Sequence, residues 1–461
     1  MATQQETDDL ARLLLSASDA EPTNAEIHPD ADATDAESTA RSNAPSEDVE
    51  SGGHKGISAG HTGTHWILTT FVLLGDMFGL GTLTLPADFA RLGWAVALPV
   101  ILICALGMVY SGILFGRLAT HLPASHAFDQ LGAAAFGASG KRMVYATVYL
   151  TILFEPVIFH LTCMESLQQM LYSANVSQIA AGAIVAVLIF PLGLVQGIEE
   201  VSTVAILGTV GMLLAVITAT YKLWFLRAID LVPTEVVHRG HFNTTLVAIM
   251  DLVFTYGGQV NWMRYITGMR HRSQFKYAAG ATSAFMTVLY IIMGSVGYYR
   301  LGSVFDFSRP VTSILPHDAW NVLMNAGVFV HCIFAYQINL NVWADMVLHI
   351  LVPHMNDPAS RRTTIGRLTW AAAIVIGIAF SFVISIFFPY FSIVMALIAS
   401  IGDLAAAYAL PAMFSLRLLG DRMPTWEKLL CYIVIPVSLV LSGMGVYSSL
   451  ASLIHEFWQR H

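Results

Sequence analysis

The chain has 461 residues, of which 56% are hydrophobic and 12% charged, with a mean hydropathy of +0.63 and a formal charge of −8. Soluble domains carry roughly 25% charged residues, so this composition excludes a soluble globular protein and predicts a polytopic membrane protein. We expect an all-α fold, because a helix satisfies its own backbone hydrogen bonds inside a bilayer.

Residues 1–62 precede the first apolar stretch and hold most of the acidity. Residues 1–60 contain 13 acidic and three basic residues, a net charge of −10 that leaves +2 for the rest of the chain. This polar segment has too little apolar surface to fold alone, so we expect a disordered cytosolic tail. Within it, Asp9–Leu14 fits the acidic dileucine pattern of sorting adaptors, although a short surface helix over Leu10–Leu15 explains the same residues.

Residues 63–455 are predicted to form a transmembrane transporter domain, followed by a short C-terminal tail at 456–461. A span needs about 20 apolar residues. On that criterion we expect eleven spans, at 66–90, 96–118, 143–172, 178–197, 202–226, 243–263, 278–300, 319–351, 368–388, 391–416 and 429–453.

The first span contains residues that interrupt a helix. Asp76, Gly79, Gly81 and Pro86 fall within twelve positions of one another in an otherwise apolar stretch. Freed backbone groups are costly in hydrocarbon, so such a break is tolerated where it is packed inside protein or lines a cavity. A ligand site is therefore expected here.

The sixth span repeats this pattern, with Asp251 followed by Gly257, Gly258, Gln259 and Asn261. Many secondary transporters consist of two inverted repeats whose first helices are both discontinuous and hold the substrate between them. Spans one and six are five apart, which fits a 5+5 inverted repeat with one extra C-terminal helix.

Basic residues predict a cytosolic N-terminus and an opposite C-terminus. Most of the bases in the loops then lie on the cytosolic side, namely Arg117, Lys141, Arg142, Arg264, Arg270, Arg272, Lys276, Arg361, Arg362, Arg367, Arg417, Arg422 and Lys428. The sequons at Asn175 and Asn243 both fall on the other side.

The two breaks also carry a family resemblance. Gly79-x-Gly81-x-Leu83-x-Leu85-Pro86, followed by Phe89 and Gly93-Trp94, resembles the first-helix signature of the amino acid/auxin permease family. Phe254-x-Tyr256-Gly257-Gly258, leading to Met269 and Phe275, is similar to its second signature. The resemblance covers residues 66 to about 450 and implies a secondary active amino acid transporter.

An amino acid zwitterion matches the two ends of a broken helix, which offer free N–H and free C=O groups. We expect its carboxylate at the N–H groups of Gly79, Leu80, Gly81 and Thr82, and its ammonium at carbonyls near Phe254, Thr255 and Tyr256, beside Gly257 and Gly258. Close helix packing is the alternative role of the glycines. Tyr256, Gln259 and Trp262 are candidates for the side-chain pocket, where the lack of a fixed cation favours neutral over acidic substrates.

Ionisable residues at membrane depth are costly and usually partnered or functional. Asp76, Glu155 and His331 are the candidates for coupling transport to protons, and His160, Asp251 and Asp403 lie at similar depth. Sodium coupling is the alternative. It would need oxygen ligands, but span eight has no Ser or Thr between Trp320 and Leu351, so protons are preferred.

Enzyme motifs are incomplete in this sequence. The Gly75-Asp76 and Gly402-Asp403 pairs lack the first glycine and the Tyr-Asp pair of intramembrane aspartyl proteases. The Gly-x-Ser-x-Gly match at Gly56–Gly60 falls in the polar tail, where no strand-to-helix turn is predicted, and Gly137-Ala-Ser-Gly140 has the wrong spacing for this elbow. We expect no catalytic residues, metal, cofactor or nucleic acid partner. A non-transporting amino acid sensor would keep the same fold, and both the plasma membrane and a vacuolar or lysosomal membrane remain open.

Overall fold

The computed structural model describes residues 63–195, 198–225, 233–302 and 310–460. The acidic segment 1–62, with the Asp9–Leu14 pattern, lies outside the described residues. The described residues are helical apart from loops and one isolated bridge between Thr64 and Met269. Eight of their helices are long and apolar enough to cross a membrane, and Trp66–Met77 and Gln178–Gly193 are shorter apolar helices.

The described helices fall into two halves of the chain, each beginning with a broken helix. The first half contains α2 (Trp66–Met77), α3 (Leu85–Leu92), α4 (Trp94–His121), α5 (Phe128–Val144), α6 (Leu150–Met170), α7 (Gln178–Gly193) and α8 (Ile198–Phe225). The second half contains α9 (Phe242–Thr255), α10 (Trp262–Thr267), α11 (Phe275–Leu301), α12 (Ala319–Leu351), α13 (Pro358–Arg362), α14 (Thr364–Phe387), α15 (Phe391–Ile398), α16 (Leu410–Leu419) and α17 (Thr425–Arg460).

Both predicted breaks are present. Between α2 and α3 the chain leaves the helix at Phe78 and makes a 3₁₀ turn, η1 (Leu80–Leu83), before Pro86 opens the first turn of α3, a position where proline costs no hydrogen bond. Between α9 and α10, Gly258 has φ +109° and a second turn, η4 (Gln259–Asn261), follows. Only glycine adopts that backbone readily.

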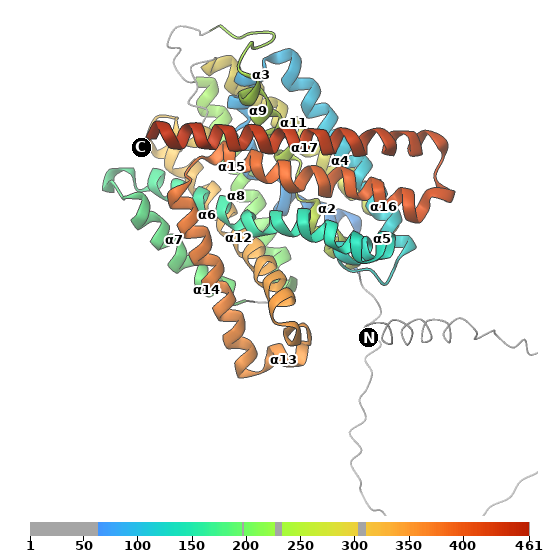
Figure 1. Cartoon of the computed structure of the whole chain (residues 1–461). Helices are drawn as coiled ribbons and strands as arrows, with labels where there is room; N and C mark the ends of the chain where they lie inside the picture. Colours follow the sequence, from blue (N-terminus) through green and yellow to red (C-terminus); the bar gives the residue numbers. More distant parts are fainter. Residues whose placement is uncertain (1–62, 196–197, 226–232, 303–309, 461) are drawn as a thin grey trace, which may run out of the picture. The chain divides into compact units, whose positions relative to one another are not determined.

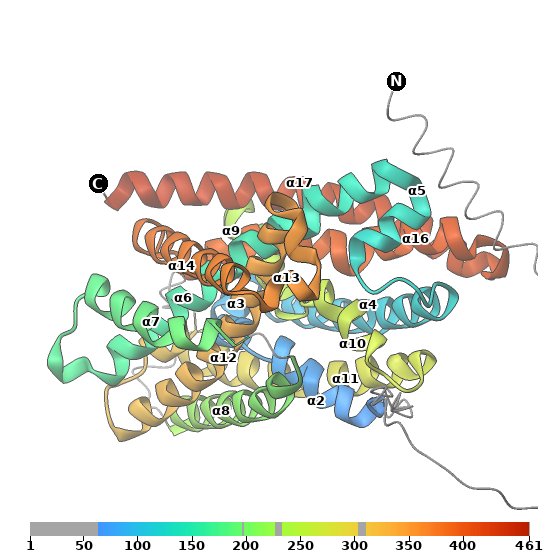
Figure 2. The same cartoon turned by 90° about the horizontal axis from the view of Figure 1, so that it is seen from below.

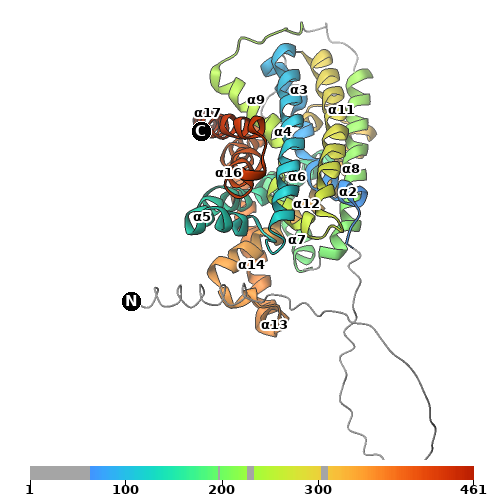
Figure 3. The same cartoon turned by 90° about the vertical axis from the view of Figure 1, so that its right-hand side faces the viewer.

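Small residues bring the helices around the breaks close together. α11 packs against α2, α3, α4 and α8, and α12 packs against α6 and α8 (Figure 3). On α11, a Cβ added at Gly294 would lie 2.7 Å from Cδ2 of Phe89 in α3. α17 lies along α15 and α16 (Figures 1 and 2), and continues to Arg460 through most of the predicted tail.

Two features were not anticipated. The hydropathy criterion predicts no span between residues 118 and 143, but Phe128–Val144 form α5, which bends at Phe136 and Gly137 (φ +59°). In addition, π-helical turns occupy 145–149, 399–403 and 405–409. Such turns are rare and are often found at functional sites.

The two ends of the helices are closed by different contacts. At one end, called the Gly93 end, the N–H of Ala95 donates to Val236 O and Lys222 pairs with Asp318 at 2.6 Å. At the other, the Thr64 end, Asp345 of α12 pairs with Arg361 at 2.6 Å and with Arg264 of α10 at 3.6 Å. The broken helices take part through Leu92 O of α3, which accepts from the N–H of His238 at the Gly93 end, and through Arg264 of α10 at the Thr64 end.

Candidate functional site

The two breaks lie directly against each other. A Cβ added at Gly81 would come within 2.7 Å of the Cα of Thr255, and one added at Gly258 would come within 2.8 Å of Met77 Cγ. Contacts under 3.0 Å require the neighbour to move. The glycines therefore allow the backbones of η1 and α9 to meet near the middle of the helices.

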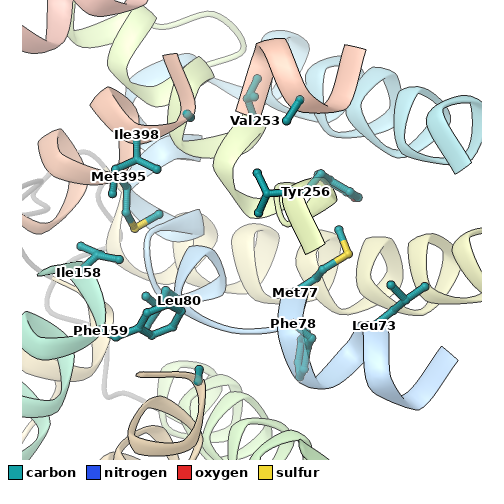
Figure 4. Packing of buried hydrophobic residues seen from close by; sticks show 14 of the residues in the cluster. Leu73, Met77, Phe78, Leu80, Ile158, Phe159, Val253, Tyr256, Met395 and Ile398 are labelled. Carbon is teal, nitrogen blue, oxygen red and sulfur yellow. The ribbon is translucent and has the colours of Figure 1, made fainter. Parts of the chain in front are cut away.

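A cavity of about 50 Å³ lies at this meeting point. It is lined by residues of both breaks and of α6, α12 and the π-helical turn after α15, namely Asp76, Met77, Gly79, Leu80, Gly81, Glu155, Phe159, Phe254, Thr255, Gly257, Gly258, Asn261, His331, Asn339 and Asp403. Figure 4 shows Leu80 of η1 beside Phe159 of α6, and Met77 near Tyr256 on the other side of the break. A water needs roughly 10–15 Å³ of such volume, so the cavity has room for a few waters.

Seven of the ten residues expected to bind substrate line this cavity: Gly79, Leu80, Gly81, Phe254, Thr255, Gly257 and Gly258. The other three do not. Thr82 is buried, Tyr256 directs its hydroxyl to Thr287 Oγ1 at 2.8 Å, and the Gln259 side-chain amide donates to Tyr256 O at 2.7 Å.

Trp262 also lies away from the cavity. Its ring packs edge-on against Phe115 and Phe275, and Nε1 donates to Met77 Sδ at 3.4 Å. The residue is fully buried in this aromatic cluster. Its position is that of a packing residue behind the second break.

The carbonyls expected to meet an ammonium already accept hydrogen bonds. Phe254 O accepts from the N–H of Gly257 at 2.7 Å, and Thr255 O accepts from the Tyr290 hydroxyl at 3.1 Å. A carbonyl oxygen has two lone pairs, so each retains capacity for a second donor. On the other side of the cavity, Leu80 and Gly81 begin η1, where the first N–H groups of a helical turn lack partners within that turn.

Three carboxyl groups from three separate segments converge on the cavity. Asp76 comes from α2, Glu155 from α6 and Asp403 from the π-helical turn. The Asn261 amide donates to both oxygens of Asp76 at 3.4 Å, and one buried oxygen of Glu155 has no hydrogen-bond partner. No lysine or arginine is among the residues lining the cavity, so the described lining is acidic.

Two of the glycines face polar side chains in the cavity. A Cβ at Gly79 would lie 2.5 Å from His331 Nε2, and one at Gly257 would lie 2.8 Å from Asp403 Oδ2. His331 is held from its other ring nitrogen, since Nδ1 lies 3.3 Å from Gly208 O of α8. The absent side chains thus let an imidazole and a carboxylate reach the broken backbone.

His160 has a different environment from His331. Its Nδ1 lies 3.1 Å from the Tyr336 hydroxyl, which also bonds to Ser381, and its ring packs edge-on against Tyr336 and Phe382. It does not line the cavity. This histidine belongs to the packing between α6, α12 and α14.

The expected binding and coupling residues do not include four residues that line the cavity, namely Met77, Phe159, Asn261 and Asn339. Asn261 carried a readable signal, because an amide within a span next to a glycine pair is rarely exposed to lipid. Phe159 carried none, since a phenylalanine in an apolar helix does not reveal which way it points.

Two broken helices that meet at a central polar cavity are the architecture of secondary transporters built from inverted repeats. Solved structures support this fold. The structure titled "Crystal structure of MhsT in complex with L-phenylalanine" matches with a TM-score of 0.55 at 13% identity, over 83% of this chain and 98% of that one. A Na⁺-coupled sialic acid symporter in a substrate-bound outward-open state matches with a TM-score of 0.50 at 11% identity, over 84% of this chain and 88% of that one.

Sequence comparison gives the family. Residues 62–455 match the family described as transmembrane amino acid transporter protein. This chain belongs to that family. It is 23% identical to amino acid transporter AVT1D of Arabidopsis thaliana, over 82% of this chain and 68% of the relative, and 21% identical to AVT1H of that plant, over 88% and 94%. The N amino acid transport system protein of Neurospora crassa is 19% identical, over 86% and 87%.

Proposed function

We propose that this protein is a secondary active transporter that moves neutral amino acids across a membrane by alternating access, driven by protons. The observation that carries the proposal is the contact between the two breaks, where the first N–H groups of η1 and the last carbonyls of α9 border one cavity. The carboxylate of an amino acid can accept from these N–H groups, and its ammonium can donate to these carbonyls.

Alternating access is supported by the size of the cavity. A volume of about 50 Å³ is too small for an amino acid, so a substrate needs the helices to part before it enters. Leu92 O of α3 accepts from the N–H of His238 at the Gly93 end, and Arg264 of α10 pairs with Asp345 at the Thr64 end. Release of one of these contacts at a time would open the cavity to one side.

Proton coupling is supported by the three carboxyl groups in the cavity. Ionised carboxylates buried without a cation are strongly disfavoured, so Asp76, Glu155 and Asp403 need protons or a positively charged partner when the cavity is closed. A proton carried with the substrate meets this need. Asp76 and Glu155, with His331 as a neighbour, are our coupling candidates.

Neutral substrates follow from the same lining. With the carboxyl groups protonated the cavity carries no net charge, and it offers no lysine or arginine to an acidic side chain among its described residues. By the distribution of basic loops, we place the N-terminus in the cytosol and the Gly93 end on the opposite side.

The test is uptake of a labelled amino acid mixture into proteoliposomes of the purified full-length protein. A pH gradient, a sodium gradient and no gradient are compared, with protein-free vesicles as the blank. Concentrative uptake under the pH gradient alone is expected. Uptake that requires the sodium gradient would make sodium the driving ion in place of the proton. Binding without uptake under any gradient would indicate a sensor.

A further inference from the structure

A second buried polar cluster lies between the cavity and the Gly93 end. It comprises Asp88 and Arg91 of α3, Asp251 of α9 and Ser392 of α15. Arg91 Nη1 lies 3.2 Å from Asp251 Oδ2, 2.8 Å from Ser392 Oγ and 3.5 Å from Asp88 Oδ1. None of the four lines the central cavity.

The cluster is sealed from its surroundings. Asp88 and Asp251 are 0% exposed, Ser392 2% and Arg91 5%. Arg91 Nη1 is within ion-pair distance of both carboxyl groups. Two carboxyl groups therefore share one guanidinium, which stays protonated in proteins.

Neighbouring helices direct their titratable groups elsewhere. On α11, which packs on α3, the Tyr290 hydroxyl donates to Thr255 O, Tyr298 bonds to the backbone of Glu235, and Arg300 donates to Leu223 O. On α17, which packs on α9 and α15, Tyr432 and Tyr447 are exposed. On α4, which packs on α3 and α9, the Tyr110 hydroxyl lies 3.3 Å from Cys431 Sγ and Arg117 pairs with Glu427. α15 itself has no titratable residue, and Asp403 borders the central cavity.

The net charge of the cluster indicates that it binds a proton. With both carboxyl groups ionised the buried cluster carries one uncompensated negative charge, a state that proteins avoid by protonating one of the two. The geometry shows which one. Asp251 Oδ2 receives hydrogen bonds from Arg91 and from the Ser392 hydroxyl, while its Oδ1 has no hydrogen-bond partner. Neither buried oxygen of Asp88 accepts a hydrogen bond, and Arg91 Nη1 lies 3.5 Å from its Oδ1, so Asp251 is the better stabilised anion.

We propose that Asp88, Arg91, Asp251 and Ser392 form a proton-binding site in which Asp88 holds the proton while α3, α9 and α15 are packed together at the Gly93 end. The site rests on the proposed function, because α3 and α9 are halves of the two broken helices and must separate from their neighbours for alternating access. When they separate, water reaches Asp88 and the proton leaves. Proton binding therefore favours closure of the Gly93 end.

Hydrogen–deuterium exchange of the full-length protein in lipid nanodiscs tests this site without requiring transport. Peptides covering α3 and α9 are followed as the pH is raised, after correction for the intrinsic pH dependence of exchange. In the wild type, loss of the Asp88 proton leaves an unbalanced charge, and we expect exchange in α3 to rise roughly tenfold or more.

Two variants and one control define the outcome. Asp88→Asn replaces the protonated acid by a neutral group of the same shape, and Asp251→Asn leaves Asp88 as the single anionic partner of Arg91. In each variant one carboxylate balances the charge of Arg91 at every pH. Both variants should therefore lose the rise in hydrogen–deuterium exchange of α3. Glu235→Gln, an exposed acid at the same end, should keep it. A rise that persists in both cluster variants, or is missing in the wild type, would overturn the site.

Uptake measured on the same preparations separates the two proposals. A pH response of α3 that disappears in Asp88→Asn while the wild type moves no amino acid would preserve the proton site and reject the transporter. Proton-driven uptake by the wild type, together with an unchanged pH response of α3 in Asp88→Asn, would preserve the transporter and reject the proton site.

Discussion

Gly81 lies against Thr255 so closely that a Cβ on the glycine would stand 2.7 Å from the Cα of Thr255. The two breaks therefore touch where Gly81 has no side chain and lies against the Cα, Cβ and hydroxyl of Thr255. This contact fixes where the free ends of the two helices meet, and it makes the position sensitive to a single methyl group.

Gly81→Ala should reduce amino acid uptake by roughly tenfold or more, because overpacking costs about 1–3 kcal/mol and pushes η1 away from α9. Gly81→Leu should abolish uptake while leaving assembly of the outer helices intact. Initial uptake rates, normalised to the amount of folded protein in the vesicles, give the measurement.

Gly443→Ala is the matched control for this substitution. Gly443 lies in α17, and no atom would lie within 4 Å of its added Cβ, so uptake should remain at the wild-type rate. Equal rates for the Gly81 and Gly443 variants would show that the contact between the breaks is unimportant for transport.

Gly79→Ala should weaken amino acid binding through His331, since the new Cβ would lie 2.5 Å from the imidazole Nε2. His331→Ala in the Gly79→Ala background should restore part of the affinity by making room. The coupling between the two changes, measured by ligand-induced thermal stabilisation of the purified variants, should fall in the range of about 0.5–3 kcal/mol seen for residues in contact. Strict additivity would place the histidine elsewhere in the working protein.

Asp76→Asn should remove accumulation driven by a pH gradient and retain exchange of labelled for unlabelled substrate. The amide keeps the shape and the contact with Asn261 but cannot release a proton. The assay compares gradient-driven uptake with exchange at equal pH. Accumulation that still follows the pH gradient would move the coupling acid to Glu155 or Asp403.

Asp318→Asn should change the pH dependence of stability and leave transport unaffected. The Lys222 ammonium at 2.6 Å lowers the pKa of Asp318 in the folded protein. The stability from this pair is therefore complete above the unfolded pKa of about 3.9 and is lost as the pH falls through the lower folded pKa.

The size of that effect is small, because the Asp318 side chain is 46% exposed and solvent screens the pair, which limits it to about 1 kcal/mol. Asparagine also caps helices well, so the cap on the Asn321 N–H is retained. Thermal unfolding from neutral to acidic pH should show a difference from the wild type that shrinks as the pH drops. A constant difference would mean that the charge plays no part.

The breaks could be predicted from sequence because glycine and proline act locally. Gly79, Gly81 and Pro86 cluster within a few residues, and this clustering predicts a break better than a single proline does, since Pro99 and Pro156 lie inside continuous helices. The bend in α5 and the π-helical turns near Asp403 were not predictable by the same means, since both depend on what the helix packs against.

The residues of the site also divide into those that local sequence predicts and those that tertiary packing places. Residues adjacent in sequence to a break, such as Gly79 and Gly257, could be assigned to the cavity from their spacing. That Glu155 and Asp403 reach the same cavity from α6 and the segment after α15 depends on tertiary packing. The directions of Tyr256 and Gln259, away from the cavity, follow from the turn at Gly258, whose φ the sequence does not specify.

The most direct test of the central claim is a cryo-electron microscopy structure of the full-length protein with a transported amino acid bound. We expect density between the breaks, with the carboxylate at the N–H groups of Gly79 to Gly81 and the ammonium beside Phe254 and Thr255. Density for the amino acid at any other place, with the cavity between the breaks empty, would contradict the account.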